Sequence, residues 1–225
     1  MKLYLLGAAN PETIRMIAAL RRHQANVSFA LLDNDPAKQD TDFHGVPVLG
    51  GVSLVPELVS GPDAHEQVRF VNLITGSTRT RLETTRAIVA GGGRLGNFIH
   101  PSIDLTMTQI GVGNYLQEGV ILQAEVQVGD NSSIHMGALV GHETRIGHSV
   151  FIAHGVSVSG CCDIGDGVFI GTNASVLPRV RIGRWATIGA GAVITKDVPE
   201  GAVVVGNPGR IIKHSEGPAC DGSVH

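Results

Sequence analysis

Residues 140–160 read VGHETRIGHSVFIAHGVSVSG, and within this stretch an aliphatic residue recurs every six positions, at 140, 146, 152 and 158. The same spacing continues in both directions, so that Ile, Leu or Val occupies fifteen consecutive sixth positions from 110 to 194. An α-helix repeats every 3.6 residues or so (about 100° per residue) and a strand every two, so neither accounts for this period. A six-residue repeat is typical of a parallel β-helix.

Each hexad predicts one short strand followed by one turn, and three hexads predict one triangular coil. The second position is glycine in eight of the fifteen hexads, and we expect this glycine to permit the turn backbone. The fifth position is Val, Ala, Ser, Thr or Cys in every hexad except the first, which has Asn114. We therefore expect about five coils with a spacing of about 4.8 Å, aliphatic residues pointing inward and small residues beside the corners.

Three histidines of the opening stretch, His142, His148 and His154, are six residues apart. Successive hexads lie on successive faces of a triangular coil, so we predict that these side chains point outward along three different edges. Within one chain they cannot share a metal ion, and we expect no metal site. Residues eighteen apart stack instead, which places Gly160 beside His142 in the next coil.

Residues 1 to about 98 follow a different pattern, in which strands and helices alternate. Buried strands are predicted by the apolar runs at 2–8, 27–35, 69–75 and 94–100. Asn10 can cap a helix that has Pro11 at its first position, and a second helix is predicted from about Thr80 to Ala90. This alternation predicts a small parallel, Rossmann-like α/β domain.

The two patterns divide the chain into three parts. We expect an α/β domain over residues 1–98, a β-helix over 99–213 and a disordered tail over 214–225.

The composition limits the partners that the chain can recruit. The net charge is −3 and there is no long basic run, which disfavours nucleic acid and anionic membrane surfaces. No stretch approaches the roughly 20 apolar residues of a membrane helix, and the short apolar run at the N-terminus is interpreted as a strand rather than a signal peptide. The three cysteines give no disulfide framework, so we expect a reducing, cytoplasmic setting.

Three further features accompany the hexads: VGHE at 140–143, AVITKDVPEGAVVVGNPGR at 192–210, and the α/β domain in front. Together they resemble the left-handed β-helix acyltransferases, in particular the subgroup of sialic acid O-acetyltransferase-like and nucleotide-amino-sugar N-acetyltransferases. The resemblance implies a left-handed coil, a homotrimer, and acetyl-CoA bound in the groove between neighbouring subunits.

The resemblance also implies a mechanism in which a sugar amine or hydroxyl attacks the acetyl-CoA thioester directly. His142 then matches the general base, Glu143 the acid that orients or polarises it, and Gly160 the residue whose backbone N–H stabilises the oxyanion. This chemistry is reasonable on its own terms, because imidazoles accept protons near neutral pH and a thioester under attack develops an oxyanion that needs a donor. Each residue also has a structural interpretation, as an edge histidine, a surface acid or a turn glycine.

On the coenzyme side of the groove, the resemblance implies contacts from Gly160, Phe151, Thr172 and Ala190. A relative can carry a second histidine at the position of Phe151, so this chain departs from the pattern there. The run GNPGR at 206–210 lets the backbone approach the coenzyme arm. The coenzyme phosphates are expected near Lys196, Arg210 and Lys213, which are otherwise ordinary surface charges.

The α/β domain resembles one that binds a nucleotide diphosphate sugar. The resemblance implies substrate contacts from Gly7, Ala9, Asn10, Asp33, Asn34 and Gly76. Relatives carry a glycine-rich turn, often with a histidine, after the first strand, whereas this chain has GAANPE at 7–12. A helix N-terminus can still bind phosphate there, although Pro11 removes one donor. The alternative is a retained domain whose site has decayed or changed its ligand.

The resemblance implies an acetyl-CoA-dependent N-acetyltransferase that acts on the amino group of a nucleotide-linked 4-amino sugar. O-acetylation of a sialic acid or another sugar would use the same base and stays open. A γ-type carbonic anhydrase would need three histidines that converge on zinc, and the six-residue spacing disfavours it. A non-catalytic β-helix is a further alternative. The residues name neither the sugar, the nucleotide base nor the acyl length.

Overall fold

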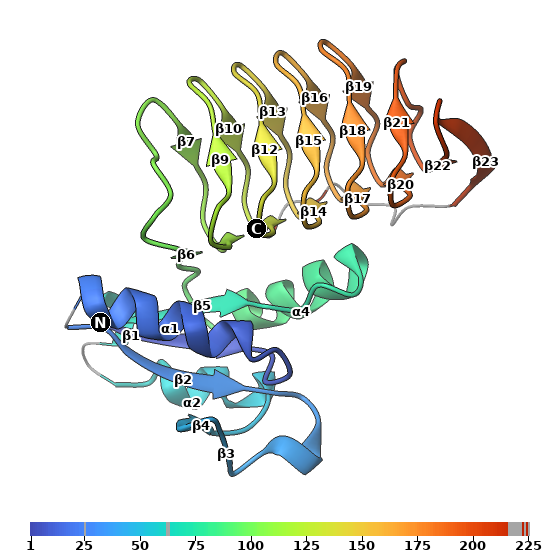
Figure 1. Cartoon of the computed structure of the whole chain (residues 1–225). Coiled ribbons are helices and arrows are strands. Elements are labelled where there is room, and N and C mark those ends of the chain that lie inside the picture. The colour runs from blue at the N-terminus through green and yellow to red at the C-terminus, as the bar shows by residue number, and fades with distance from the viewer. Residues whose placement is uncertain (25, 62–63, 216–221, 223, 225) are drawn as a thin grey trace.

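Fifteen two-residue strands, β7 to β21, follow one another at six-residue intervals and form a long β-helix (Figure 1). The computed structural model describes residues 1–24, 26–61, 64–215, 222 and 224. The strands are β7 (Gln109–Ile110), β8 (Tyr115–Leu116), β9 (Ile121–Leu122), β10 (Gln127–Val128), β11 (Ser133–Ile134), β12 (Leu139–Val140), β13 (Arg145–Ile146), β14 (Phe151–Ile152), β15 (Ser157–Val158), β16 (Asp163–Ile164), β17 (Phe169–Ile170), β18 (Ser175–Val176), β19 (Arg181–Ile182), β20 (Thr187–Ile188) and β21 (Val193–Ile194).

Every third strand pairs in parallel, so residues eighteen apart are neighbours, as in the pair Arg145 and Asp163. Three faces result, which we call the β12 face (β9, β12, β15, β18, β21), the β13 face (β7, β10, β13, β16, β19) and the β14 face (β6, β8, β11, β14, β17, β20, β22, β23). The aliphatic residue of nearly every hexad and the small residue at the fifth position are buried in a single core. The predicted triangular β-helix is confirmed.

The role predicted for the second-position glycine is wrong. A left-handed backbone with positive φ lies at the fourth position of every hexad but the last (Asp197), and it is found even at Glu143 (+57°) and Cys161 (+59°). The second-position glycines are needed for a different reason, because the coils stack closely there. A Cβ at Gly141, for example, would lie 2.4 Å from the backbone nitrogen of Gly160.

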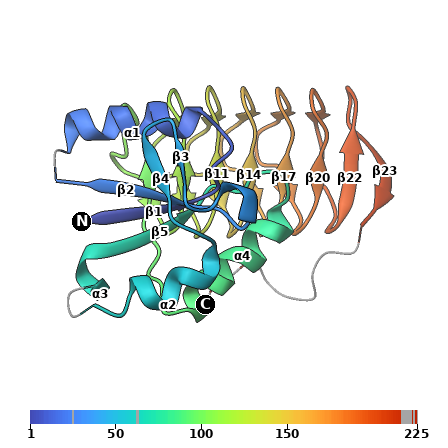
Figure 2. The same ribbon diagram turned by 90° about the horizontal axis from the view of Figure 1, so that it is seen from below.

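The N-terminal part is a five-stranded sheet in the order β3-β4-β2-β1-β5, parallel except for the edge strand β3. Its strands are β1 (Lys2–Leu6), β2 (Ser28–Leu32), β3 (Thr41–Phe43), β4 (Val46–Val48) and β5 (Val68–Asn72). Helices cover both faces (Figure 2): α1 (Glu12–His23) lies on one, and α2 (Val55–Leu58), α3 (Ala64–Gln67) and α4 (Thr78–Ala90) lie on the other, with short 3₁₀ turns at Pro36–Lys38 and Val52–Leu54. The predicted α/β arrangement is confirmed.

Local sequence explains where the two longer helices begin. Asn10 accepts a hydrogen bond from the Glu12 amide through Oδ1 (3.0 Å), as expected of a cap, and α1 begins at Glu12, one residue after the predicted Pro11. Ser77 caps α4 by accepting from the Thr80 amide. On the inner side of α1, Met16, Ile17 and Leu20 are buried against the sheet.

The segment 94–100 connects the two parts, and the prediction that it adds a strand to the α/β sheet is wrong. Only an isolated bridge joins Leu95 to Phe70, whereas β6 (Phe98–Ile99) pairs with β8 and so starts the β14 face. The backbone hydrogen bonds determine which sheet the segment joins, because the Phe98 amide donates to the Asn114 carbonyl of the β-helix rather than to β5.

A fully buried arginine holds the two parts together. Arg81 of α4 donates to the carbonyls of Asn131 (2.7 Å), Gly113 (3.2 Å) and Ile74 (3.2 Å), and burial lowers its pKa to about 9. The first two carbonyls belong to turns between the β13 and β14 faces. Because these backbone oxygens replace water around the cation, the α/β part is fixed along one edge of the β-helix.

Two antiparallel strands, β22 (Ala202–Val205) and β23 (Arg210–His214), close the far end of the β-helix. Within the predicted tail, His214 ends β23, the Gly222 carbonyl accepts from Ser149 Oγ, and Val224 is buried in a cluster with Leu82 and Trp185. Residues 216–221, 223 and 225 of that tail lie outside the described residues, and the predicted disorder stays a prediction. Among the described residues, no helix has the length and hydropathy needed to cross a membrane.

Candidate active site

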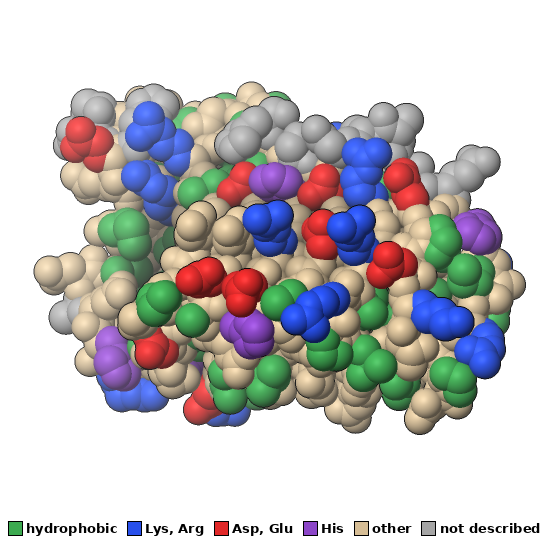
Figure 3. Space-filling view, turned by 90° about the horizontal axis from the view of Figure 1, so that it is seen from above, with side chains coloured by type: hydrophobic (Ala, Val, Ile, Leu, Met, Phe, Trp, Pro, Cys, Tyr) green, Lys and Arg blue, Asp and Glu red, His purple; other side chains and the backbone are tan. Residues whose placement is uncertain are grey.

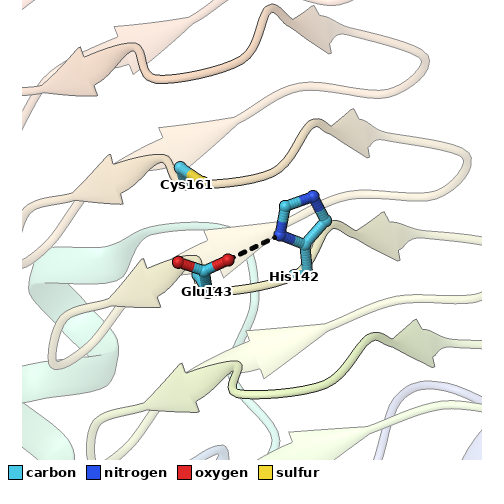
Figure 4. A group of neighbouring side chains, drawn as sticks. All are labelled: His142, Glu143 and Cys161. Atoms are coloured by element: carbon cyan, nitrogen blue, oxygen red, sulfur yellow. Dashed lines mark hydrogen bonds and ion pairs between the residues drawn. The ribbon is translucent and has the colours of Figure 1, made fainter.

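His142 lies in the turn that connects the β12 and β13 faces, which we call the β12/β13 edge. Its Nδ1 lies 3.1 Å from Oε1 of Glu143, and both side chains are more than half exposed (56% and 58%) (Figure 4). The His142 amide donates to Oε1 of Gln123 in the preceding coil (2.9 Å), which fixes the backbone beneath the imidazole. Sequence reasoning did not single out Gln123, since nothing in the hexad pattern marks it.

The imidazole of His142 stacks on Gly160, where the eighteen-residue spacing places it. A Cβ at Gly160 would lie 2.7 Å from Nε2, 2.9 Å from Cε1 and 3.0 Å from Cδ2 of the ring. Only a bare backbone therefore fits beside the ring.

The Gly160 amide has no hydrogen-bond acceptor among the described residues. At the same position of other hexads, the amide donates to a side chain, as it does at Asp130, Met136, His142 and His148. An amide without a partner at an accessible turn is available to a ligand. If Nδ1–H of His142 donates to Glu143, the lone pair of Nε2 faces the same space, so that a proton acceptor and a hydrogen-bond donor lie side by side.

The other two histidines of the repeat lie on the other two edges, as predicted. His148 is on the β13/β14 edge, where its Nδ1 accepts from the Asp130 amide (2.9 Å). His154 is exposed on the β14/β12 edge. His135 on that same edge is buried against His154, and burial together with the nearby His154 and Arg81 lowers its pKa to about 3. His135 therefore stays neutral and is part of the packing.

The residues predicted on the coenzyme side fall on two different edges. Lys196 lies on the β12/β13 edge three coils beyond His142, or about 14 Å along the axis. It lines a cavity of about 420 Å³ together with Arg210 of β23. Thr172 and Ala190 are exposed in turns of the β14/β12 edge. Phe151 is only 7% exposed and stacks on Phe169, which leaves little of it accessible to a ligand.

A second cavity, of about 300 Å³, opens at the carboxyl ends of β1, β2 and β5. The order of the strands reverses between β1 and β5, and such a switch point is where open α/β sheets bind ligands. Of the predicted substrate residues, Gly7, Ala9, Asn10, Asp33 and Asn34 line this cavity. Gly76 is absent from the lining. The sequence reasoning missed Thr13, Lys38, Leu73, Ile74, Thr75 and Tyr115, which also line it.

Asp33 organises the floor of this cavity. Burial opposes its ionisation, but hydrogen bonds from the amides of Asp35 and Ala8 and from Lys38 Nζ outweigh burial and lower the pKa of the carboxyl group. The carboxylate therefore fixes the loop after β1 and holds the Lys38 ammonium at the cavity. The amides of Ala9 and Asn10 have no acceptor among the described residues, so with Lys38 they provide donors for an anion.

The cavity and His142 lie on opposite sides of the β-helix. The α/β part covers the β14 face and contacts both of its edges, through Arg81 and Asn131 on one side and Arg15 and Glu118 on the other. The remaining edge, between β12 and β13, faces away from the α/β part (Figure 1), and it carries His142. The β-helix of the chain itself therefore lies between the cavity and His142.

Comparison with known proteins agrees with this architecture. The family model described as bacterial transferase hexapeptide (six repeats) matches residues 161–196. No curated protein gives a significant match. A structure of perosamine N-acetyltransferase from Caulobacter crescentus, in complex with CoA and GDP-perosamine, has 28% identity and a TM-score of 0.83 over 95% of this chain and 97% of that one.

Two further structures match over similar lengths. The acetyltransferase domain of PglB from Neisseria gonorrhoeae, in complex with acetyl coenzyme A, has 29% identity and a TM-score of 0.81, covering 94% of this chain and 98% of that one. WeeI from Acinetobacter baumannii has 25% identity and a TM-score of 0.79, covering 94% and 100%.

The repeat and these matches identify the fold as a left-handed β-helix and support acyltransferase activity, as in the hexapeptide-repeat transferases that the chain resembles. The likeness to perosamine N-acetyltransferase extends over 95% of the chain, so it includes the α/β part as well as the β-helix.

Proposed function

We propose that this protein transfers the acetyl group of acetyl-CoA to the amino group of a nucleotide-linked 4-amino sugar, with His142 as general base. The observation that carries the proposal is the packing of the His142 imidazole against Gly160, whose amide has no acceptor within the part of the chain that the structure describes. The complexes of similar enzymes with CoA and GDP-perosamine support both substrates.

In the proposed reaction the sugar amine attacks the thioester carbon while Nε2 of His142 accepts the proton that the amine loses. Glu143, hydrogen-bonded to Nδ1 at 3.1 Å, holds the tautomer and stabilises the imidazolium that forms. The Gly160 amide donates to the carbonyl oxygen as its negative charge develops. Collapse of the tetrahedral intermediate then breaks the C–S bond, and the imidazolium of His142 gives its proton to the departing thiolate of CoA.

A homotrimer with active sites between subunits fits the distribution of these residues. His142, Gly160 and Lys196 lie on one edge of the β12 face, whereas Thr172 and Ala190 lie on its other edge. A single coenzyme that contacts both sets must therefore lie between two copies of the β-helix. The β12 face between these edges carries apolar and small outward residues, among them Ile121, which is 54% exposed. Such a surface is suited to self-association.

The distribution of side chains on the surface agrees with the proposed contact between subunits. Seen from the side away from the α/β part, charged and histidine side chains gather along part of the β-helix, and hydrophobic side chains gather along one of its long sides (Figure 3). The α/β cavity of a neighbouring chain would bring the nucleotide, with Lys38 and the Ala9 and Asn10 amides at its phosphates.

The test is acetyl transfer from acetyl-CoA to a panel of nucleotide-linked 4-amino sugars, measured beside free sialic acids. We expect activity with one or more of the amino sugars and a large loss in H142A, whose fold should persist because the side chain is exposed. Transfer to a sialic acid hydroxyl alone would replace the proposal with O-acetylation. Transfer that H142A leaves unchanged would refute the role of the base.

A further inference from the structure

A cysteine lies beside the His142–Glu143 pair, and the proposed acetyl transfer does not use it. Cys161 is eighteen residues after Glu143 and therefore stacks on it one coil further along the β12/β13 edge (Figure 4). Its amide donates to the His142 carbonyl (2.8 Å), which fixes the two turns against each other. One ligand atom each from His142, Glu143 and Cys161 lies within 4.8 Å of the other two.

We propose that His142, Glu143 and Cys161 form a binding site for a thiophilic divalent cation such as Zn²⁺, and that this cation inhibits the enzyme. Imidazole, carboxylate and thiolate are the three ligand types that zinc takes in proteins, and three of them leave the fourth tetrahedral position for water. With Zn–S of about 2.3 Å and Zn–N of about 2.0 Å, the ligand atoms lie about 3–4 Å apart. Closing the observed span requires these ligand atoms to move by about 1 Å, which the exposed side chains of His142 and Glu143 can do by rotating.

The donor set favours a soft cation over the hard ones. A thiolate selects zinc and similar metals, whereas magnesium and calcium require oxygen ligands. As the Zn–S bond forms, the Cys161 thiol loses its proton to solvent, and the Glu143 oxygen exchanges its hydrogen bond with Nδ1 for the metal.

Inhibition follows from the chemistry of the ring and rests on the proposed role of His142. If the metal takes Nε2, it consumes the lone pair that accepts the substrate proton. If it takes Nδ1, the ring's one proton resides on Nε2, which then has no lone pair to offer. Either geometry removes the base.

The neighbouring cysteine provides a matched control. Burial raises the pKa of the Cys162 thiol, and its Sγ points to the carbonyls of Leu177 (3.3 Å) and Gly160 (3.8 Å), away from the cluster. Cys162 is thus a thiol of the same turn without access to the cation. Cys162 occupies the fifth position of its hexad and is buried in the core.

The third cysteine of the sequence, Cys220, is first replaced by serine (C220S), so that Cys161 and Cys162 are the remaining thiols. The test then titrates this reduced protein with Co²⁺, which absorbs visible light and substitutes for Zn²⁺. We expect one equivalent to bind with a thiolate-to-cobalt charge-transfer band that Zn²⁺ displaces. C161S should abolish the band and weaken binding about tenfold or more, while C162A should retain it. No saturable band in the parent protein, a band that survives C161S, or one lost only in C162A would overturn the proposal.

A second measurement connects the site to catalysis. Zn²⁺ should inhibit acetyl transfer by the parent and by C162A, and C161S should need about tenfold more Zn²⁺ for the same inhibition. Mg²⁺ should have no such effect. The cobalt titration does not depend on substrate, so loss of the proposed transferase function would leave it unchanged. Equal Zn²⁺ inhibition of C161S and the parent would refute the inhibitory role.

Discussion

Replacing Gly160 with alanine should impair catalysis by displacing the base while leaving the oxyanion donor in place. The added Cβ would lie 2.7 Å from His142 Nε2, whereas ordinary contact begins at 3.4 Å, so the ring must retreat by 0.7 Å. A misplacement of about 1 Å can cost about 100-fold in rate. We therefore expect kcat to fall by about 10- to 100-fold, equivalent to about 1.4–2.7 kcal/mol in the barrier.

The fold should tolerate G160A. The three nearest atoms to the new methyl group all belong to the exposed His142 ring, and the Gly160 backbone is not left-handed. The free energy of unfolding should therefore change by less than about 0.5 kcal/mol. The assay is steady-state acetyl transfer by wild type, G160A, H142A and the double variant, with thermal unfolding of each.

The double-mutant cycle isolates the effect. If Gly160 acts by making room for the ring, G160A should cost nothing further once His142 is alanine. A kcat for G160A equal to that of wild type, or an equal loss in the H142A background, would contradict the reasoning.

Three more substitutions test other parts of the account. E143Q should lower kcat about 10- to 100-fold with little change in KM for acetyl-CoA, because it weakens the hydrogen bond that orients Nδ1; steady-state kinetics would show this, and an unchanged kcat would make Glu143 a surface acid. His135 has a folded pKa of about 3 against an ordinary 6.5, so the unfolded chain binds its proton first as pH falls. Stability should decrease between these two values by a few kcal/mol more in wild type than in H135F, which denaturant titrations at several pH values would detect; identical pH profiles would contradict the burial argument. R81M should cost about 3 kcal/mol or more in unfolding free energy, since three backbone carbonyls lose their partner; a loss below about 1 kcal/mol would mean that the arginine does not fix the α/β part.

The repeat made much of the β-helix predictable, because three hexads of six residues form one coil and residues eighteen apart are then neighbours in adjacent coils. The eighteen-residue spacing predicted that His142 and Gly160 are neighbours. The six-residue spacing predicted that His142, His148 and His154 lie on separate edges. The conformation of the turns was not predictable from the glycines, since Glu143 and Cys161 take the left-handed backbone. Coil stacking enforces that backbone, and no local preference of these two residues signals it.

The α/β part was predictable as alternating strands and helices, but the composition of its cavity was not. Lys38 lies in a short 3₁₀ turn, and only its ion pair with Asp33 brings it to the cavity. Tyr115 reaches the cavity from β8, across the junction of the two parts. Single-sequence patterns report periodicity along one element, so contacts between distant elements escape them. The same limit explains why β6 was assigned to the wrong sheet. Its pairing depends on which neighbouring strand offers the better backbone hydrogen-bond partners.

The central claim is that the nucleotide cavity of one chain works with His142 of another. Subunit complementation tests it most directly, with H142A and A9E as the two inactive partners. Ala9 is exposed in the cavity lining, so glutamate there repels a diphosphate without disturbing the core. After the two variants are co-refolded or co-expressed in equal amounts, we expect about a quarter of wild-type activity, because each site needs one chain of each kind in a fixed order. A mixture of confirmed hetero-oligomers that stays inactive would place cavity and base in the same chain and contradict the account.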